Sequence, residues 1–429
     1  MLDIKKIDRF QKEYIKNNND VKRRIFNTVK LVDLVQDINT SDNNVFSNEI
    51  KTHGITDQQF TGYCWMYAGF NILREEVIKN LELRSFELSV NYLAYYDKLE
   101  RFNSLLDRLI ELNSEGKDAY DRNISLYLEI AVGDGSFSLN FAELVKKYGV
   151  VPKTVFPDTF ATTNSSEVRI ILSRLARKFY LELEKKPKDI DKIKDKYLDY
   201  ALKVVTDLYG IPPKKFNFEY VDKNNKYHII KDLTPLSFYK EYVKINLADN
   251  YVEIASYQDE RFKYNNVYEG IRSTRIIGTP DIKIMNLSPD DFKGVIDRQL
   301  KGGEFVYTSS ITTPTLYAGK FIDIIKKYGE LLDLDLTFNR NDILKTNEIA
   351  NCHAMIITGY NMVDDEITKY KLENSYGGKK GNNGYFTATP EWLNTYVFRV
   401  FVNKKYLTKE QKEVLKKPVI KYNDLDFKF

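Results

Sequence analysis

The sequence predicts an α+β protein in which a helical first lobe is followed by a lobe built from antiparallel strands. A helix-forming apolar pattern begins at Cys64 and repeats every three to four residues through Val77, as expected for a buried helix. Close to the C-terminus, short apolar runs predict strands, and Asn383-Gly384 between two of them is a strong signal for a tight turn. The predicted strands cover residues 354–360, 370–374, 385–387 and 396–402.

The middle of the chain contains further helical patterns. One runs over residues 88–112, and the next ends where Gly149 and Pro152 mark a helix stop and a turn. Residues 165–209 predict two helices separated near Pro187. Their interleaved acidic and basic side chains favour a solvated insertion over a nucleic-acid patch.

The length and composition of the chain limit the classes of protein to which it can belong. The 429 residues exceed the usual length of one domain, so several lobes or large insertions are expected. Hydrophobic residues make up 43% and aromatic residues 14%, which excludes a disordered chain. The net charge of +4 is small and does not by itself attract polyanions. Because no secretory signal or membrane span is recognisable and two cysteines are too few for a disulfide scaffold, a cytoplasmic protein is expected.

Cys64 and His353 are the candidate nucleophile and base of a cysteine peptidase. Cys64 stands at a predicted helix start, where the helix dipole favours a thiolate. A neighbouring histidine can lower a thiol pKa from about 8.5 to about 3–4, so a largely ionised thiol is expected. Of the three histidines, His53 lies in a polar stretch and His228 has no other candidate group nearby. His353 begins an apolar strand that would hold its ring rigidly.

Asn374 and Gln58 complete the candidate site. Asn374 ends the strand that follows the His353 strand, so its amide can orient the imidazole as the third member of a triad does. Gln58 precedes Cys64 by six residues. Its amide can therefore join the Cys64 backbone N–H in an oxyanion hole.

These residues together give the chain a specific resemblance. The pattern that resembles the papain superfamily of cysteine peptidases comprises Gln58, Cys64-Trp65, His353-Ala354 and Glu373-Asn374-Ser375. The long interval between Cys64 and His353 is similar to that of the branch containing bleomycin hydrolase and bacterial aminopeptidase C. Segments such as KYGVVPKTVFPDTF and LENSYGGKKGNNGYFTATPEWLNTYVFRVFVNKKYL also resemble this branch.

The resemblance implies a papain-like core with a helical left lobe, an antiparallel barrel-like right lobe, large helical insertions and a C-terminal arm. It implies that Cys64 attacks, His353 carries the proton, Asn374 orients His353 and Gln58 holds the oxyanion. The expected divisions are a helical lead-in (1–50), the helical lobe with the nucleophile (51–164), a helical insertion (165–235), a mixed linking region (236–335), the β lobe with His353 and Asn374 (336–407) and an arm reaching toward the active site (408–429).

The resemblance also implies an aminopeptidase that acts on peptides through an acyl-enzyme and assembles as a homohexamer. Some members of the family bind nucleic acid, a partner for which the near-neutral charge gives weak support. No membrane partner and no cofactor are expected. Two cysteines and three histidines offer no paired spacing for metal ligands, so no metal site is expected either.

Two departures from the family pattern bear on activity. Tyr376 stands where the family has tryptophan, which keeps an aromatic ring near the triad. In the family's aminopeptidases the terminal carboxylate lies in the cleft and pairs with the substrate ammonium, a role that the resemblance gives to Phe429. The tail here reads Asp424-Leu425-Asp426-Phe427-Lys428-Phe429 and lacks the family's proline, which leaves an endopeptidase as the alternative.

Further alternatives stay open. An acyl transferase with the same triad and a non-catalytic ring that binds nucleic acid are both compatible with the sequence. Cys352 precedes His353 on a strand, so its side chain is expected to face away from the histidine and to be a packed thiol. The glycines at 377, 378, 381 and 384 match no phosphate-binding pattern and are interpreted as loop and turn residues.

Overall fold

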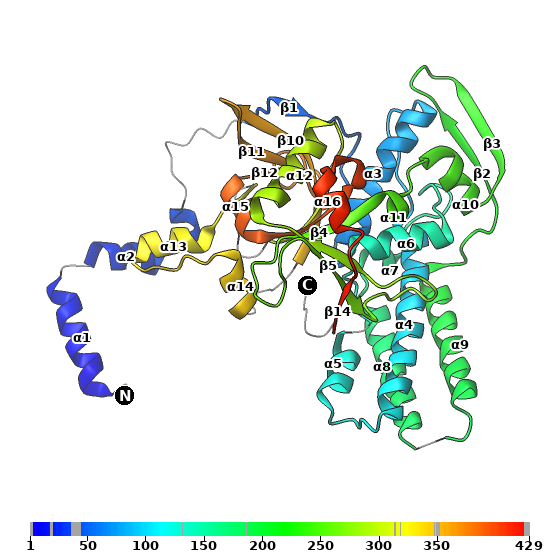
Figure 1. Ribbon diagram of the computed structural model, residues 1–429, viewed down its shortest axis with the longest axis horizontal. Coiled ribbons are helices and arrows are strands. Elements are labelled where there is room, and N and C mark those ends of the chain that lie inside the picture. The colour runs from blue at the N-terminus through cyan, green and yellow to red at the C-terminus, as the bar shows by residue number, and fades with distance from the viewer. Residues whose placement is uncertain are drawn as a thin grey trace.

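A helical lobe and a sheet lobe make up most of the molecule (Figure 1). The computed structural model describes residues 3–17, 20–35, 44–130, 132–185, 187–312, 315–317, 319–346, 348 and 352–423. Helices precede most of the strands along the chain, and the last third supplies the central strands of the large sheet. This is the α+β architecture that the sequence predicts.

Two long helices organise the helical lobe, α3 (Cys64–Leu81) and α4 (Val90–Ser114). Most residues of α3 are buried, because its sequence is apolar around nearly the whole circumference. The remaining helices of this lobe are α5 (Arg122–Ile130), α6 (Ser138–Tyr148), α7 (Phe160–Thr163), α8 (Ser166–Leu183), α9 (Ile190–Tyr209), α10 (Pro235–Phe238), η2 (Tyr239–Val243) and α11 (Leu247–Asn250).

The helix boundaries in this lobe follow the sequence signals. α3 begins at Cys64, as predicted. α6 ends at Tyr148 because Gly149 takes a φ of 73°, which a residue without a Cβ adopts at no steric cost. The helical insertion breaks between α8 and α9, as its proline predicted.

A twelve-stranded sheet forms the second lobe among the described residues. Its order is β14-β5-β6-β4-β13-β7-β10-β11-β12-β9-β8, with β1 paired to β10. The strands are β1 (Asn48–Glu49), β4 (Tyr251–Ala255), β5 (Asn266–Ile271), β6 (Lys283–Asn286), β7 (Val306–Ile311), β8 (Leu316–Tyr317), β9 (Lys320–Phe321), β10 (Cys352–Val363), β11 (Glu366–Glu373), β12 (Tyr385–Ala388), β13 (Val397–Asn403) and β14 (Ile420–Asn423).

The four strands predicted near the C-terminus correspond to β10, β11, β12 and β13. β10 lies between β7 and β11, and both pairings are antiparallel. Asn383 and Gly384 have φ values of 52° and 87°, as the predicted tight turn requires. The helices of this lobe are α12 (Pro289–Lys301), α13 (Ile324–Leu332), α14 (Arg340–Thr346), α15 (Pro390–Tyr396), η3 (Lys404–Tyr406) and α16 (Lys409–Val414).

The two lobes meet where α3 lies against the sheet. The hydrophobic core of the helical lobe includes Tyr307 of β7 and Ala354 and Ile356 of β10. The Tyr307 hydroxyl donates a hydrogen bond of 3.3 Å to the backbone carbonyl of Trp65. The N-terminus of α3 is thereby held beside the start of β10.

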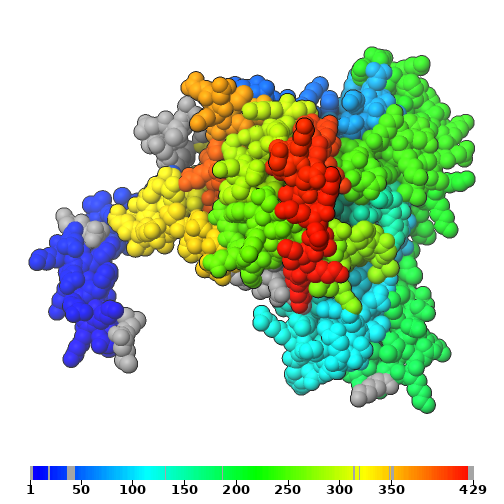
Figure 2. All heavy atoms as spheres, in the orientation of Figure 1, coloured from blue at the N-terminus to red at the C-terminus, as the bar shows by residue number. Residues whose placement is uncertain are grey.

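Peripheral segments extend from this body. The N-terminal helices α1 (Ile4–Lys16) and α2 (Asp20–Thr28), followed by η1 (Leu31–Leu34), have no buried residues, and α1 stands apart in Figure 2. β2 (Phe216–Val221) and β3 (Tyr227–Leu233) form a separate hairpin. The C-terminal residues (red in Figure 2) run down one face of the sheet lobe, where β14 pairs with β5. Among the described residues, no helix has the length and hydropathy needed to span a bilayer.

The close approach of α3 to α6 gives a testable prediction. A Cβ at Gly69 would lie 2.3 Å from the Phe141 ring, so Gly69→Ala should reduce the free energy of unfolding by about 1–3 kcal/mol through overpacking. Gly294→Ala in α12 is the control, because its Cβ would meet the flexible end of Arg298 at 3.2 Å. Urea denaturation should show a loss for Gly69→Ala alone; equal effects of the two substitutions would contradict the packing argument.

Candidate active site

Cys64 is the first residue of α3 and is 8% exposed. The backbone N–H groups of a first helical turn have no partner inside the helix, so the Cys64 amide is available to an incoming group. The backbone amides of Ala354 and Trp65 lie close enough to the thiol to lower its pKa, against the effect of burial. The nucleophile candidate therefore lies where the helical lobe touches β10.

Asp134, in the turn between α5 and α6, fixes the start of α3. Its carboxylate accepts hydrogen bonds from the Gly62 amide at 3.1 Å and from the Lys98 ammonium at 2.6 Å, and also from Ser165. Its backbone carbonyl accepts from the Trp65 indole N–H at 2.7 Å. Asp134 thus binds residues on both sides of Cys64, namely Gly62 and Trp65.

His353 and Asn374 are brought together by the β10–β11 hairpin. His353 is 6% exposed and Asn374 is 1% exposed. His353 Nε2 and Asn374 Oδ1 are 2.7 Å apart. The Ser375 backbone N–H donates to the same Asn374 oxygen at 2.7 Å, which fixes the orientation of the amide.

This arrangement decides which imidazole nitrogen carries the proton. The Asn374 oxygen can only accept, so His353 donates through Nε2–H. The other ring nitrogen, Nδ1, is then unprotonated in the neutral imidazole. It is the atom that could take a proton from a thiol.

Tyr376 covers the imidazole. Its ring stacks on His353 with centroids 4.7 Å apart and an interplanar angle of 23°. Burial first, and then the charge of Cys64, raise the pKa of Tyr376 to about 12, so the thiol lies within electrostatic range of the ring that covers His353. The aromatic ring expected from the family pattern is present at this position.

Gln58 is held from both ends of its amide. Its Nε2 donates to the Thr61 carbonyl at 2.6 Å, and its Oε1 accepts from the Ser375 hydroxyl at 2.6 Å. The Gln58 backbone N–H donates to the Ser375 carbonyl at 2.9 Å. Gln58 is therefore tied to the residue that follows Asn374, and the second N–H of its amide remains available.

The thiol and the imidazole are both driven toward their neutral forms. Burial raises the pKa of Cys64 to about 11, against the backbone hydrogen bonds that lower it. Burial lowers the pKa of His353 to about 4, and the Asn374 hydrogen bond opposes this change only in part. Burial of both groups therefore opposes the ionised thiol that the sequence predicts, because desolvation disfavours the charged form of each.

A buried ion pair joins α3 to the end of β11. Arg74 is 2% exposed, and its Nη2 donates to Glu373 Oε1 at 2.9 Å. The same guanidinium donates to Asn71 at 3.1 Å and to Glu75 at 2.9 Å. Glu373 immediately precedes Asn374, so this pair couples the helix of Cys64 to the strand that delivers Asn374.

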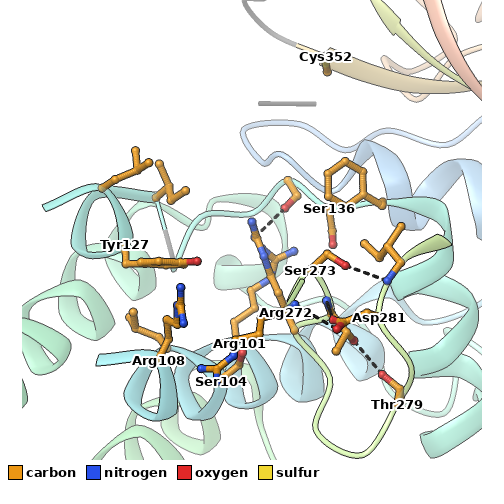
Figure 3. A pocket seen from close by; sticks show the side chains of 18 of the residues that line it. Arg101, Ser104, Arg108, Tyr127, Ser136, Arg272, Ser273, Thr279, Asp281 and Cys352 are labelled. Carbon is orange, nitrogen blue, oxygen red and sulfur yellow. Dashed lines mark hydrogen bonds between the residues drawn. The ribbon is translucent and has the colours of Figure 1, made fainter. Parts of the chain in front are cut away.

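A cavity of about 790 Å³ opens beside Cys64. Figure 3 shows Cys352 at one side of it and Arg101, Arg108 and Tyr127 at the other. Its volume lies within the range of about 300–1,000 Å³ that is common for ligand pockets. Five arginines are among the residues that line it, namely Arg101, Arg108, Arg272, Arg275 and Arg399.

The remaining sequence predictions have mixed outcomes. The packed thiol predicted for Cys352 is wrong, because this side chain is exposed and lines the same cavity as Cys64. Cys352 is the first residue of its strand, and the alternation that predicted its direction does not say what covers it. His53 and His228 instead pair with Glu75 and Asp222. Phe429 lies outside the described residues.

Comparison with known proteins identifies the family. The chain matches the model of the Peptidase C1-like family over residues 1–427. It belongs to this family. Aminopeptidase C of Lactobacillus delbrueckii subsp. lactis is 35% identical over 376 residues, which cover 86% of this chain and 83% of that protein. Aminopeptidase E of Lactobacillus helveticus is 34% identical over 382 residues, with coverages of 87% and 86%.

A solved structure supports the same assignment. The crystal structure of PepW from Lactobacillus rhamnosis HN001 superposes with a TM-score of 0.91 at 30% identity. The match covers 99% of this chain and 98% of PepW. This member of the Peptidase C1-like family is thus a cysteine peptidase with a papain-like fold.

Sequence reasoning missed three supporting residues. Asp134 sits in a short Gly-Asp-Gly segment that gives no sign of its contacts with Gly62 and Trp65. Arg74 lies within an apolar helix, where its charge was the available signal for a buried partner. Ser375 was noted only as part of a motif, although it bonds both Gln58 and Asn374.

The contacts of Asp134 predict acid sensitivity. Burial alone would raise its pKa, but Lys98 and the hydrogen bonds from Ser165 and Gly62 lower it to about 2 from an ordinary 3.8. The unfolded chain therefore binds the proton first as the pH falls. About 2 kcal/mol of unfolding free energy, present above pH 3.8, should be lost as the pH falls toward 2.

Urea denaturation across this pH range measures the effect. Asp134→Asn should be less stable at neutral pH, and its stability should fall less between pH 4 and 2 than that of the wild type. If the free energy of unfolding falls equally with pH in the two proteins, Asp134 makes no such contribution to stability.

The ion pair between the lobes gives a second prediction. Arg74→Met leaves Glu373 buried without its partner, so the free energy of unfolding should fall by about 3–5 kcal/mol. Lys203→Met is the matched control, because Lys203 pairs with Asp207 on the exposed face of α9 and should contribute at most about 1 kcal/mol. Chemical denaturation of both variants tests this; a loss below that of the control would disprove the role of the pair.

Proposed function

We propose that this protein is a cytosolic aminopeptidase that uses Cys64, His353 and Asn374 as its catalytic triad. The observation that carries the proposal is the 2.7 Å contact between His353 Nε2 and Asn374 Oδ1, which leaves Nδ1 unprotonated. The names of its relatives, aminopeptidases C and E, support the exopeptidase class. A homohexamer is part of the same proposal and follows from the resemblance alone.

The proposed first step is a coupled proton transfer and attack. Because both groups are driven toward neutrality, His353 Nδ1 takes the Cys64 proton as the sulfur forms its bond to the substrate carbonyl. The imidazolium keeps its Nε2–H on Asn374, which holds the ring in place. Tyr376 limits ring rotation by stacking on it.

The second part of the reaction stabilises and then resolves the intermediate. The Cys64 amide and the free N–H of the Gln58 side chain would donate to the oxyanion that develops on the carbonyl. His353 then returns its proton to the leaving amine, and a thioester remains on Cys64. Water attacks this acyl-enzyme with His353 again acting as base.

In this proposal, the last residue of the sequence, Phe429, restricts cleavage to the N-terminal residue of a substrate. We propose that the Phe429 carboxylate pairs with the ammonium of the substrate. Tyr422 of β14 lines the cavity that also contains Cys64, and six residues follow Asn423 in the sequence.

An endopeptidase is the second candidate, and the unusual tail sequence favours it. If the tail does not close the cleft, a cavity of about 790 Å³ offers room for residues on the N-terminal side of the cleaved bond. Acyl transfer to an amine by the same triad and nucleic-acid binding by a non-catalytic ring have no structural observation in their favour.

The oxyanion donor is tested by substitution. Gln58→Ala should lower kcat by about 10²–10³-fold with little change in KM, because the lost hydrogen bond strengthens in the transition state. Gln59→Ala is the control, since Gln59 is the exposed neighbour. Steady-state kinetics on an aminoacyl fluorogenic substrate, with Cys64→Ala as the inactive reference, measure the effect; equal kcat in both glutamine variants would remove Gln58 from the mechanism.

The tail is tested by comparing free and blocked substrates. Deleting residues 426–429 should lower kcat/KM on free-amine peptides and raise it on N-acetylated peptides, because the new terminal carboxylate, four residues earlier, no longer reaches the substrate ammonium and the cleft is opened. Phe429→Leu, which keeps a terminal carboxylate, should retain the preference for free amines. Wild-type protein that cleaves acetylated peptides as well as free ones would establish the endopeptidase instead.

A further inference from the structure

The two cysteines of the chain open onto the same space. Cys64 and Cys352 are its only cysteines, and both line the cavity of about 790 Å³. Cys352 is exposed, and Figure 3 shows it on its strand at the edge of this cavity. The proposed mechanism uses Cys64 and leaves Cys352 without a role.

The strand geometry places the two thiols near each other. Cys64 of α3 and Ala354 of β10 belong to the same hydrophobic cluster, at the place where the helix meets the strand. Ala354 and Cys352 are two residues apart on β10, so their side chains leave the same face of the strand, about 7 Å apart along it. Cys352 is also near enough for its charge to act on Cys64. A disulfide requires Cα atoms about 4.4–6.8 Å apart, so the two residues must come within this range for the bond to form.

A metal site does not account for this pair. No group of three or more histidine, cysteine, aspartate or glutamate side chains suited to a metal ion occurs among the residues that the structure describes. A redox relationship between the thiols uses both of them and needs no further ligand.

We propose that Cys352 is a resolving thiol that captures oxidised Cys64 in a reversible disulfide. The oxidant is a hydroperoxide. The Cys64 thiolate, formed by proton transfer to His353, attacks the outer peroxide oxygen; an S–O bond forms, the O–O bond breaks and the leaving oxygen takes up a proton as water or an alcohol. Cys64 is oxidised by two electrons to a sulfenic acid.

The second step consumes the sulfenic acid. The Cys352 sulfur attacks the Cys64 sulfur; an S–S bond forms, the S–O bond breaks and the Cys352 proton leaves with the hydroxyl as water. A dithiol reductant reverses the change by thiol–disulfide exchange and is itself oxidised to a disulfide. The disulfide thus protects Cys64 from the sulfinic and sulfonic acids, which thiols do not reduce.

The experiment compares full-length wild type with Cys352→Ser, treated with hydrogen peroxide and then with dithiothreitol. In the wild type, non-reducing peptide mapping by mass spectrometry should find the peptides of Cys64 and Cys352 linked, in a chain lighter by two hydrogen atoms. Dithiothreitol should separate the peptides and restore most of the lost peptidase activity. Relative to its own activity before treatment, Cys352→Ser should regain little with dithiothreitol, and its Cys64 should be found as sulfinic or sulfonic acid.

Two results would overturn the proposal. One is peroxide-treated wild type in which Cys64 is oxidised while Cys352 stays a free thiol; the other is a disulfide that joins two chains. The effect on activity rests on the proposed role of Cys64, whereas the linked peptides are detected by mass alone. Linked peptides in a protein without peptidase activity would therefore refute the proposed function and leave the disulfide standing.

Discussion

The buried pair of Arg74 and Glu373 is the constraint on which the site depends. A papain-like cleft takes its nucleophile from a helix of one lobe and its base from a strand of the other, so the lobes must keep a fixed relation. Arg74 reaches from α3 to the last residue of β11, and Glu373 is followed directly by Asn374. Because an uncompensated buried charge is costly, this pair resists any movement that separates the helix from the strand end.

Hydrogen bonds at the two ends of this link set the finer geometry. On the helical side, Asp134 joins the turn before Cys64 to the indole of Trp65. On the strand side, Ser375 bonds both Gln58 and Asn374. The side chains proposed for catalysis are therefore held in place by neighbouring residues that take no part in the reaction, as a preorganised site requires.

Local patterns in the sequence were sufficient to predict the helix, the strands and the turn on which the site is built. The apolar run after Cys64, the short strand patterns and Asn383-Gly384 have their causes within a few residues, and the structure places a helix, strands and a tight turn there. The partners of Asp134 and Arg74 lie in distant segments, and a contact across the fold leaves no periodic signal. Cys352 was misjudged for the same kind of reason, because alternation along a strand gives the face of a side chain and not what covers that face.

The two N-terminal helices have a consequence for how copies of this protein behave toward one another. Residues 1–35 contain nine basic and five acidic side chains, a surplus equal to the charge of the whole chain, so the rest of the molecule is formally neutral. α1 also exposes Ile4 and Phe10 to solvent. Net charge keeps protein molecules apart in solution. The electrostatic part of colloidal stability is therefore concentrated on a segment whose described residues belong to neither hydrophobic core.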